Sequence, residues 1–195
     1  MLAILCCMMA TSCVVGCNLF STFLVKDVYQ AQGKSNKEAD EHLSILFLVT
    51  NSLCLVISLL FGWISDRVKI YKTILLTNIG ILASGFMMLY AIYSGQGKAL
   101  SILFYLGFVL TMVIRCLQFM TAVNLISRIT SDQTRGTMFA FNGIMASIGI
   151  TVLQGCGGYF YTNVSKAAPF LYWYVGYLLV TVFNLVLVAM GKLTV

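Results

Sequence analysis

Charge is scarce in this 195-residue chain, in which only 9% of the residues are Asp, Glu, Lys or Arg. Soluble domains carry about 25% charged residues, and the mean hydropathy of this chain is +0.94. So much apolar surface could not be hidden in a core surrounded by water, which excludes a water-soluble globular protein. The net charge of +6 would suggest nucleic acid in a soluble protein. Here we expect the basic residues of the short turns to lie near lipid headgroups, with no nucleic-acid partner.

Histidine and proline are nearly absent, with one residue of each, and the loops contain no cysteine. All seven cysteines fall inside hydrophobic stretches, whereas His42 lies at the end of a hydrophilic loop. This separation argues against a metal site or a disulfide framework, and cysteines within apolar stretches are typical packing residues. Because the sequence also shows no phosphate-binding loop and no nucleophile–base pair, we expect no cofactor and no enzymatic activity.

Carboxylates are missing from every hydrophobic stretch, since all six Asp and Glu residues lie in turns or loops. The chain instead contains a series of stretches long enough for the roughly 20 residues that a helix needs to cross a bilayer. They do not alternate in polarity, as the strands of a membrane barrel would. We therefore predict an all-α membrane protein. The uncharged stretches cover 2–25, 43–65, 73–97, 136–165 and 167–191, and a sixth, 99–127, is interrupted only by Arg115.

We predict that residues 1–195 form a single multi-pass transmembrane domain of six helices. An even number of crossings places both termini on the same side of the membrane. The dense positive charge of the two short turns on that side favours the cytoplasm, although the other side carries almost as many basic residues. The predicted spans are about 2–25, 36–65, 72–94, 100–128, 132–161 and 168–191.

A polar loop of mixed charge is expected at residues 26–42. In its second half, Ser35 and Glu38 have the spacing of a capping box, in which each satisfies a free amide of the other at a helix start. Thr130 and Gln133 repeat this spacing before the fifth span. Both helices are therefore expected to begin at these residues, and the second helix to begin outside the lipid.

Four sequence features resemble the C-terminal six-helix half of the major facilitator superfamily of solute transporters. One feature follows the second span, one precedes the fifth span, one ends it, and one precedes the sixth span. The resemblance therefore extends over nearly the whole chain. It implies one bundle of two inverted three-helix repeats in a lipid bilayer. The features are Gly62-x-x-x-Asp66-Arg67, Arg135-Gly136, Gly155-Cys156-Gly157-Gly158-Tyr159-Phe160 and Ala168-Pro169-Phe170.

Arg115 is the strongest candidate for contact with a solute. It lies near the middle of the fourth span, where an arginine costs roughly 2.5–3.5 kcal/mol on insertion scales, which favours a position facing protein or a watery cavity. The resemblance implies that the first, second, fourth and fifth helices line the central cavity, with Gln118 one turn from Arg115. The guanidinium could bind an anionic solute or a carboxylate of a second bundle. Alternatively, it is bonded to helix carbonyls or extends toward an interface.

Other polar residues lie on the same lining helices. Ser147, Thr151 and Gln154 share one helix face, which could line an aqueous path or form hydrogen bonds between helices. Gly143, one turn before Ser147, would permit close helix contact. Since the spans contain neither a carboxylate nor a histidine, the sequence offers no obvious proton site. The further candidates for solute binding are Asn18 on the first helix, Asn51 with its neighbour Ser52 on the second, and Asn142 on the fifth.

The charged turn has a different expected role. In the family this turn clasps neighbouring helices and stabilises one conformation of the transport cycle. The alternative is a set of ordinary surface charges, each worth about 0–1 kcal/mol. The resemblance implies the gating role for Gly62, Asp66, Arg67, Arg135 and Gly136.

These expectations together describe a protein that transports a small solute by alternating access. Two bundles are needed for that cycle. A six-helix chain would have to form a homodimer, pair with a separate N-terminal half, or be a fragment of a longer protein. The second interpretation is a non-transporting integral membrane subunit with a structural or regulatory role.

Overall fold

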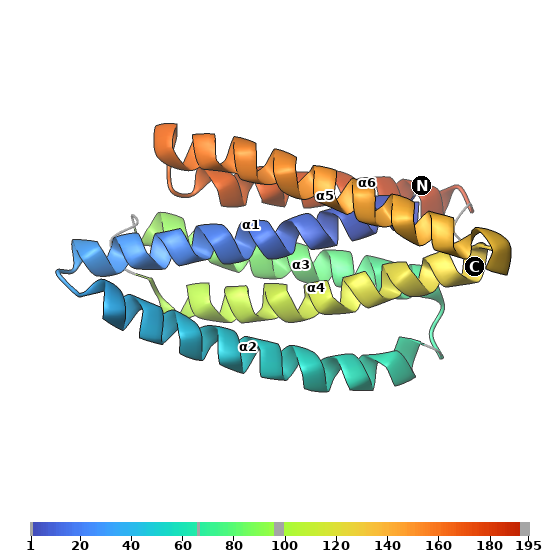
Figure 1. Ribbon diagram of the computed structural model, residues 1–195, viewed down its shortest axis with the longest axis horizontal. Helices are drawn as coiled ribbons and strands as arrows, with labels where there is room; N and C mark the ends of the chain where they lie inside the picture. The colour runs from blue at the N-terminus through green and yellow to red at the C-terminus, as the bar shows by residue number, and fades with distance from the viewer. Residues whose placement is uncertain (1, 66, 96–99, 192–195) are drawn as a thin grey trace.

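A computed structural model describes residues 2–65, 67–95 and 100–191 of the protein; the side chains of residues 2–15, 17, 65 and 153 are outside this description. Within these residues the chain forms an all-helical bundle with no strand (Figure 1). The helices are α1 (Leu2–Ala31), α2 (Asn36–Ser65), α3 (Ile70–Ser94), α4 (Ile102–Ile129), α5 (Asp132–Asn163) and α6 (Ala168–Ala189). They run side by side along the long axis of the molecule, and α1 begins at the same end of the bundle at which α6 finishes.

Five of the described helices, α2 to α6, are long and apolar enough to cross a membrane. Their outward surfaces are apolar as well: Leu59 on α2 is 73% exposed and Ile102 on α4 is 77% exposed. Water would disfavour such surfaces strongly, whereas lipid or a second protein surface would cover them at no hydrophobic cost. The fold is therefore that of a membrane bundle, as predicted.

The packing of the helices agrees with two three-helix repeats. If α1, α2 and α3 form one repeat, their equivalents in the second repeat are α4, α5 and α6. The contact between α2 and α4 then has its equivalent in the contact between α5 and α1, and the contact between α3 and α4 has its equivalent in that between α6 and α1. The contacts α1·α4 and α3·α6 map onto themselves. Only the contact between α5 and α6 lacks a comparable counterpart in the described residues. As a result, α1 and α4 form the centre of the bundle.

The predicted loop at residues 26–42 is wrong at residues 26–31, which are helical, whereas the second helix begins at Asn36 as expected. α1 continues to Ala31, and the turn consists of residues 32–35, with Gly33 in the left-handed conformation at φ 74°. Glycine adopts this conformation without steric strain, which allows the tight reversal. We call the end of the bundle that carries residues 32–35 the loop end. Lys26 and Asp27, assigned to the loop from their polarity, therefore lie on a helix.

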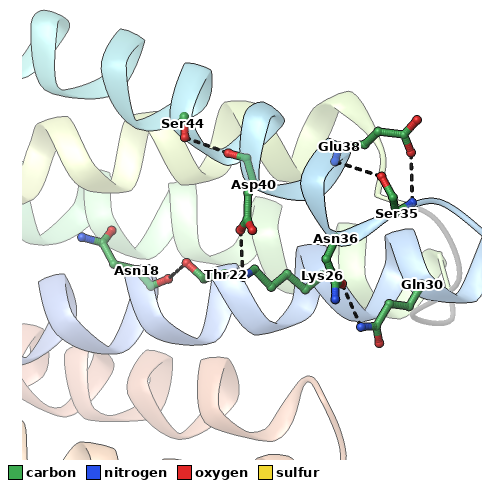
Figure 2. A network of polar contacts seen from close by, with 9 residues as sticks. All are labelled: Asn18, Thr22, Lys26, Gln30, Ser35, Asn36, Glu38, Asp40 and Ser44. Carbon is green, nitrogen blue, oxygen red and sulfur yellow. Dashed lines mark hydrogen bonds and ion pairs between the residues drawn. The ribbon is translucent and has the colours of Figure 1, made fainter.

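The predicted capping box begins α2 as expected. The Ser35 amide donates to Glu38 Oε2 over 3.1 Å, and the Glu38 amide donates to Ser35 Oγ over 3.3 Å (Figure 2). These two bonds satisfy amides that the first turn of a helix leaves without partners. The position of this helix start is thus set by local sequence.

The second predicted capping box does not form. Ser131 is the N-cap of α5, and its hydroxyl contacts the Thr134 hydroxyl at 2.9 Å. The Thr130 hydroxyl instead donates to the Ile126 carbonyl over 2.6 Å. The Thr130 side chain is therefore bonded to the last turn of α4. Because the connection between α4 and α5 is so short, Thr130 cannot also cap the start of α5.

The described core is densest at the loop end, where α1, α3 and α4 meet. Phe104 and Phe108 of α4 are fully buried there against Leu24 of α1 and Met88 of α3. A smaller cluster around Ile74 and Ile126 joins α3 and α4 toward the opposite end. These buried clusters join α1, α3 and α4 and so position the side chains that the three helices carry.

Candidate solute-binding site

Arg115 lies midway along α4 and is half-buried. Its Nη1 atom is 3.6 Å from the Met112 sulfur and its Nη2 atom is 4.0 Å from the Cys116 sulfur, and both neighbours are on its own helix. Thioether and thiol sulfur are weak acceptors. No ion pair among the described residues includes Arg115. The guanidinium thus carries a charge that the described part of the bundle does not balance.

The boundary between α2 and α4 lies next to this arginine. The Cys54 thiol of α2 lies beside Cys116 of α4, within range of the charge of Arg115. Asn51 precedes Cys54 by about one helical turn, and its side chain is exposed. Two of the predicted site residues, Arg115 and Asn51, are therefore placed at the same boundary.

Gln118 has a different environment from Arg115. Its side chain is 1% exposed, its Nε2 donates to Asn78 Oδ1 on α3, and its Oε1 accepts from the Tyr177 hydroxyl on α6 over 2.8 Å. The amide is thus engaged by α3 and α6 in the interior of the bundle. Sequence reasoning did not identify Asn78 and Tyr177, because single polar residues in apolar spans give no sign of their partners.

The polar stripe of α5 is exposed in the described bundle. Ser147 and Thr151 donate to the carbonyls of Gly143 and Ser147 on their own helix, each over 3.0 Å. Gln154 is exposed further along the same helix. A shallow surface depression runs along this face and is lined by Ala140, Gly143, Ile144, Ser147, Ile148, Thr151 and Val152.

The predicted close helix contact at Gly143 is wrong for this bundle. No atom lies within 4 Å of the position that a Cβ on Gly143 would occupy. Among the described glycines of α5, close contact occurs at Gly157, where a Cβ would lie 2.5 Å from the ring of Phe20 on α1. The Gly143 face is therefore small and open, and it is free to receive another surface.

Two asparagines of the predicted site have buried oxygens without a partner among the described residues. They are Asn18 Oδ1 on α1 and Asn142 Oδ1 on α5. Buried polar atoms usually have a partner, and water often supplies it. The side-chain atoms that Arg115 contacts belong to Met112 and Cys116, and not to Asn18, Asn142 or Gln154. The described structure therefore does not bring the whole predicted set together.

The charged turns make local contacts. Arg67 places its guanidinium over the Trp63 ring, 3.9 Å from the centroid, and Arg135 pairs with Asp132 on the same helical turn at 2.9 Å. Gly136 is exposed with open space around it. Asp66 lies outside the described residues. These contacts of Arg67 and Arg135 stay within each turn, and the gating role of the charged turns stays a prediction.

The long apolar helices and their apolar outward surfaces make this an integral, multi-pass membrane protein. The model of the Major Facilitator Superfamily matches residues 1–194 of this chain, and the chain belongs to that family. It is therefore a membrane transport protein that acts on a small-molecule solute in a lipid bilayer, and its family is one of transporters and not of enzymes. No characterised protein and no solved structure matches the chain.

Proposed function

We propose that this chain acts as the C-terminal half of an alternating-access transporter and that Arg115 contacts an anionic group of the solute. The observation that carries the proposal is the half-buried guanidinium midway along α4, which has only two sulfur atoms as its described side-chain contacts. A charge held at this depth is favourable only when an anion or water balances it. A carboxylate or phosphate group matches the planar donor fork of arginine.

A second bundle is part of the proposal, because one bundle cannot enclose a solute. The exposed faces of α2 and α5 offer surfaces for it: Leu48 and Leu59 are exposed on α2, and the small residues around Gly143 are open on α5. Small residues allow close approach of helices in membranes. The second bundle is a second copy of this chain, a separate N-terminal half, or another part of a longer protein of which this chain is a fragment.

The role of Arg115 can be tested in proteoliposomes after a screen has found a transported solute. Arg115→Lys keeps the charge but loses the bidentate fork, and Arg115→Gln loses both. Charge-assisted hydrogen bonds contribute about 1.5–3 kcal/mol, so solute affinity is expected to fall by roughly 10- to 100-fold, more for Gln than for Lys. The measurement is the concentration dependence of uptake.

A matched control is available at the end of the same helix. Arg128 is exposed and its Nε donates to Asn124 Oδ1 over 3.2 Å, so Arg128→Gln removes the same charge away from the proposed site. This variant should keep the affinity of the unaltered protein. If Arg115→Gln binds and transports every detected solute normally, the guanidinium is not a solute contact. If it binds normally but the two bundles separate, Arg115 instead pairs with the second bundle.

We also propose that both termini face the cytoplasm, so that Lys34 at the loop end faces the opposite side. The support is the density of basic residues in the short turns. A Lys34→Cys variant in a cysteine-free background should react with a membrane-impermeant thiol reagent only from the non-cytoplasmic side. Reaction only from the cytoplasmic side would reverse the orientation.

A further inference from the structure

A line of polar side chains follows the boundary between α1 and α2 from the loop end toward the middle of the bundle. On α1 its members are spaced by four residues, which places them on one helix face. Figure 2 shows how this face lies against α2. We call these residues the α1/α2 seam: Asn18, Thr22, Lys26 and Gln30 on α1, and Asn36, Asp40 and Ser44 on α2.

Two contacts fix the register of this seam. Gln30 Nε2 donates to Asn36 Oδ1 over 2.9 Å, and Lys26 Nζ pairs with Asp40 Oδ1 at 2.7 Å. Because the helices are antiparallel, the next step of four residues on each helix brings Thr22 level with Ser44. Polar residues therefore continue on both helices below the ion pair.

The inner part of the seam is polar but incompletely satisfied. The Thr22 hydroxyl donates to the Asn18 carbonyl over 2.7 Å, while Asn18 Oδ1 is buried without a partner among the described residues. Beside the outer part of the seam, a surface depression runs along α2 and is lined by Lys37, Asp40, Glu41, Ser44 and Ile45 of that helix. Unsatisfied polar groups at membrane depth are tolerated where water can reach them. These features favour a hydrated seam.

The seam also leads in the direction of Arg115. Asn18 is one step of four residues beyond Thr22, and Asn51 is about two helical turns beyond Ser44. Asn51 in turn lies one turn from Cys54, whose thiol lies beside Cys116, the residue next to Arg115. A polar solute moving along the seam from the loop end would therefore meet polar groups up to the depth of the arginine.

The opposite side of α1 is closed by apolar packing. Phe20 stacks on Tyr161 of α5 with ring centroids 6.0 Å apart, and it lies against Gly157 so closely that a Cβ there would be 2.5 Å from the ring. Phe23 also contacts Tyr161, at 6.1 Å between centroids. We call this group, with Asp27, the α1/α5 seam. Its rings pack against one another and against Gly157.

We propose that the α1/α2 seam is the access route for water and small polar solutes from the loop end toward Arg115, and that the Lys26–Asp40 ion pair is its gate. The pair lies across the seam one step of four residues inside the Gln30–Asn36 hydrogen bond. Its side chains are 35% and 57% exposed, so water screens the attraction and the pair can open readily. The α1/α5 seam stays closed while the gate opens. The destination of this route rests on the proposed function.

The route can be tested by the reactivity of introduced thiols, which needs no knowledge of the solute. Thr22→Cys, in a chain whose seven native cysteines are replaced, places a thiol inside the gate. Ser21→Cys is the matched control, because Ser21 is the adjacent residue and is 0% exposed. A membrane-impermeant methanethiosulfonate applied from the loop side should modify the thiol from Thr22→Cys at least about tenfold faster. Lys34→Cys verifies the side of application.

Removing the gate should raise this reactivity further. An exposed ion pair contributes little, so Asp40→Asn and Lys26→Met should each accelerate modification at Thr22→Cys by about two- to fivefold, and together by no more than either alone. Asp27→Asn removes the neighbouring charge on the other side of α1 and should leave the rate unchanged. The exchange of Lys26→Asp with Asp40→Lys should restore the slow rate.

Two results would overturn the proposal. If the thiol from Thr22→Cys reacts as slowly as that from Ser21→Cys, both with and without Asp40→Asn, water does not enter the seam and the seam is not an access route. If Asp27→Asn accelerates modification as much as Asp40→Asn does, the ion pair is no gate and the helix end simply loosens. Neither result bears on Arg115, whose role is measured by solute uptake, so the two proposals can fail separately.

Discussion

The two sides of α1 at the loop end differ in kind, although they begin from adjacent residues. Lys26 turns toward α2 and forms one exposed ion pair in a polar seam. Asp27 turns toward α5, where Lys166 Nζ lies 2.9 Å and the Tyr161 hydroxyl 2.7 Å from the same carboxylate oxygen, above packed aromatic rings. The α1/α2 contact is polar at these residues, whereas the α1/α5 contact includes packed aromatic rings. In our proposal the movable contact therefore lies between α1 and α2 and the fixed contact between α1 and α5.

A transporter needs both kinds of contact on its central helices. The bundle must hold its shape while it moves, and apolar interdigitated packing resists continuous deformation. It must also open a path for a polar solute, and polar contacts can be exchanged for water at little free-energy cost. The α1/α5 seam serves the first need, and we assign the α1/α2 seam to the second.

The largest expected effect on the stability of the bundle comes from adding a methyl group to the packed α1/α5 seam. Gly157→Ala would place a methyl group 2.5 Å from the Phe20 ring. That ring is held by Tyr161, so overpacking should destabilise the bundle by about 1–3 kcal/mol. The measurement is thermal unfolding in detergent, followed by circular dichroism.

Gly143→Ala provides the control on the same helix, since no atom lies within 4 Å of its added methyl group. Alanine favours a helix over glycine by about 1 kcal/mol. The control bundle should therefore be as stable as the unaltered protein or slightly more stable. Equal destabilisation by both variants would show that the contact between Phe20 and Gly157 does not hold α1 to α5.

The next effect comes from the polar end of the same seam. Asp27→Asn removes the charge that pairs with Lys166 and weakens the acceptor of the Tyr161 hydroxyl. Because the Asp27 side chain is 33% exposed, the loss should be about 1 kcal/mol. The Lys26–Asp40 ion pair is more exposed, so Asp40→Asn should reduce the stability of the bundle by less. If chemical unfolding gives Asp40→Asn the larger loss, the assignment of the fixed and the separable side is reversed.

The smallest effect is a dependence of stability on pH. Burial alone would raise the pKa of Asp27, but hydrogen bonds from Lys166 and Tyr161 and the positive charge of Lys166 bring it below its ordinary value. A carboxylate with a lowered pKa stabilises the folded state above the unfolded pKa of about 3.9, and this contribution is lost as the pH falls through the folded pKa. The contribution should be constant between about pH 5 and 8.

Comparing unfolding of the unaltered protein and Asp27→Asn from neutral to acidic pH tests this expectation. The difference in unfolding free energy between them should be constant at neutral pH and shrink only below about pH 4. Asp40→Asn serves as the comparison on the other side of α1. A difference that vanishes between about pH 6 and 7 would contradict the lowered pKa of Asp27.

Local sequence predicted the features that depend on neighbours in the chain. The Ser35–Glu38 capping box could be found because both partners lie within one helical turn. The fifth helix begins at Asp132 as predicted, but its capping residue was wrong, because Thr130 and Ser131 both have capping chemistry and the end of α4 decided which was available. The length of α1 was wrong for a related reason, since the ion-pair partners of Lys26 and Asp27 lie outside α1, on α2 and in the turn between α5 and α6.

The candidate site was predictable in its residue types and much less in its geometry. Arg115 stood out because a charge inside an apolar span is costly wherever it faces. Gln118 has the same polarity signal as Asn51, yet it bonds inside the bundle to Asn78 and Tyr177, while Asn51 is exposed. Facing direction depends on how α4 is rotated between its neighbours, and no single residue of the helix encodes that rotation.

The sequence by itself determined that this protein lies in a membrane, that it is helical and that it belongs to a transporter family, because composition, stretch length and local motifs are properties of contiguous residues. Only the tertiary structure decided that Lys26 and Asp27 point to opposite sides of α1. Asp27 and Tyr161 are 134 residues apart in the chain. Contacts over such separations form only when whole helices pack against one another. The packing therefore determines with which partner each of the two adjacent charges pairs.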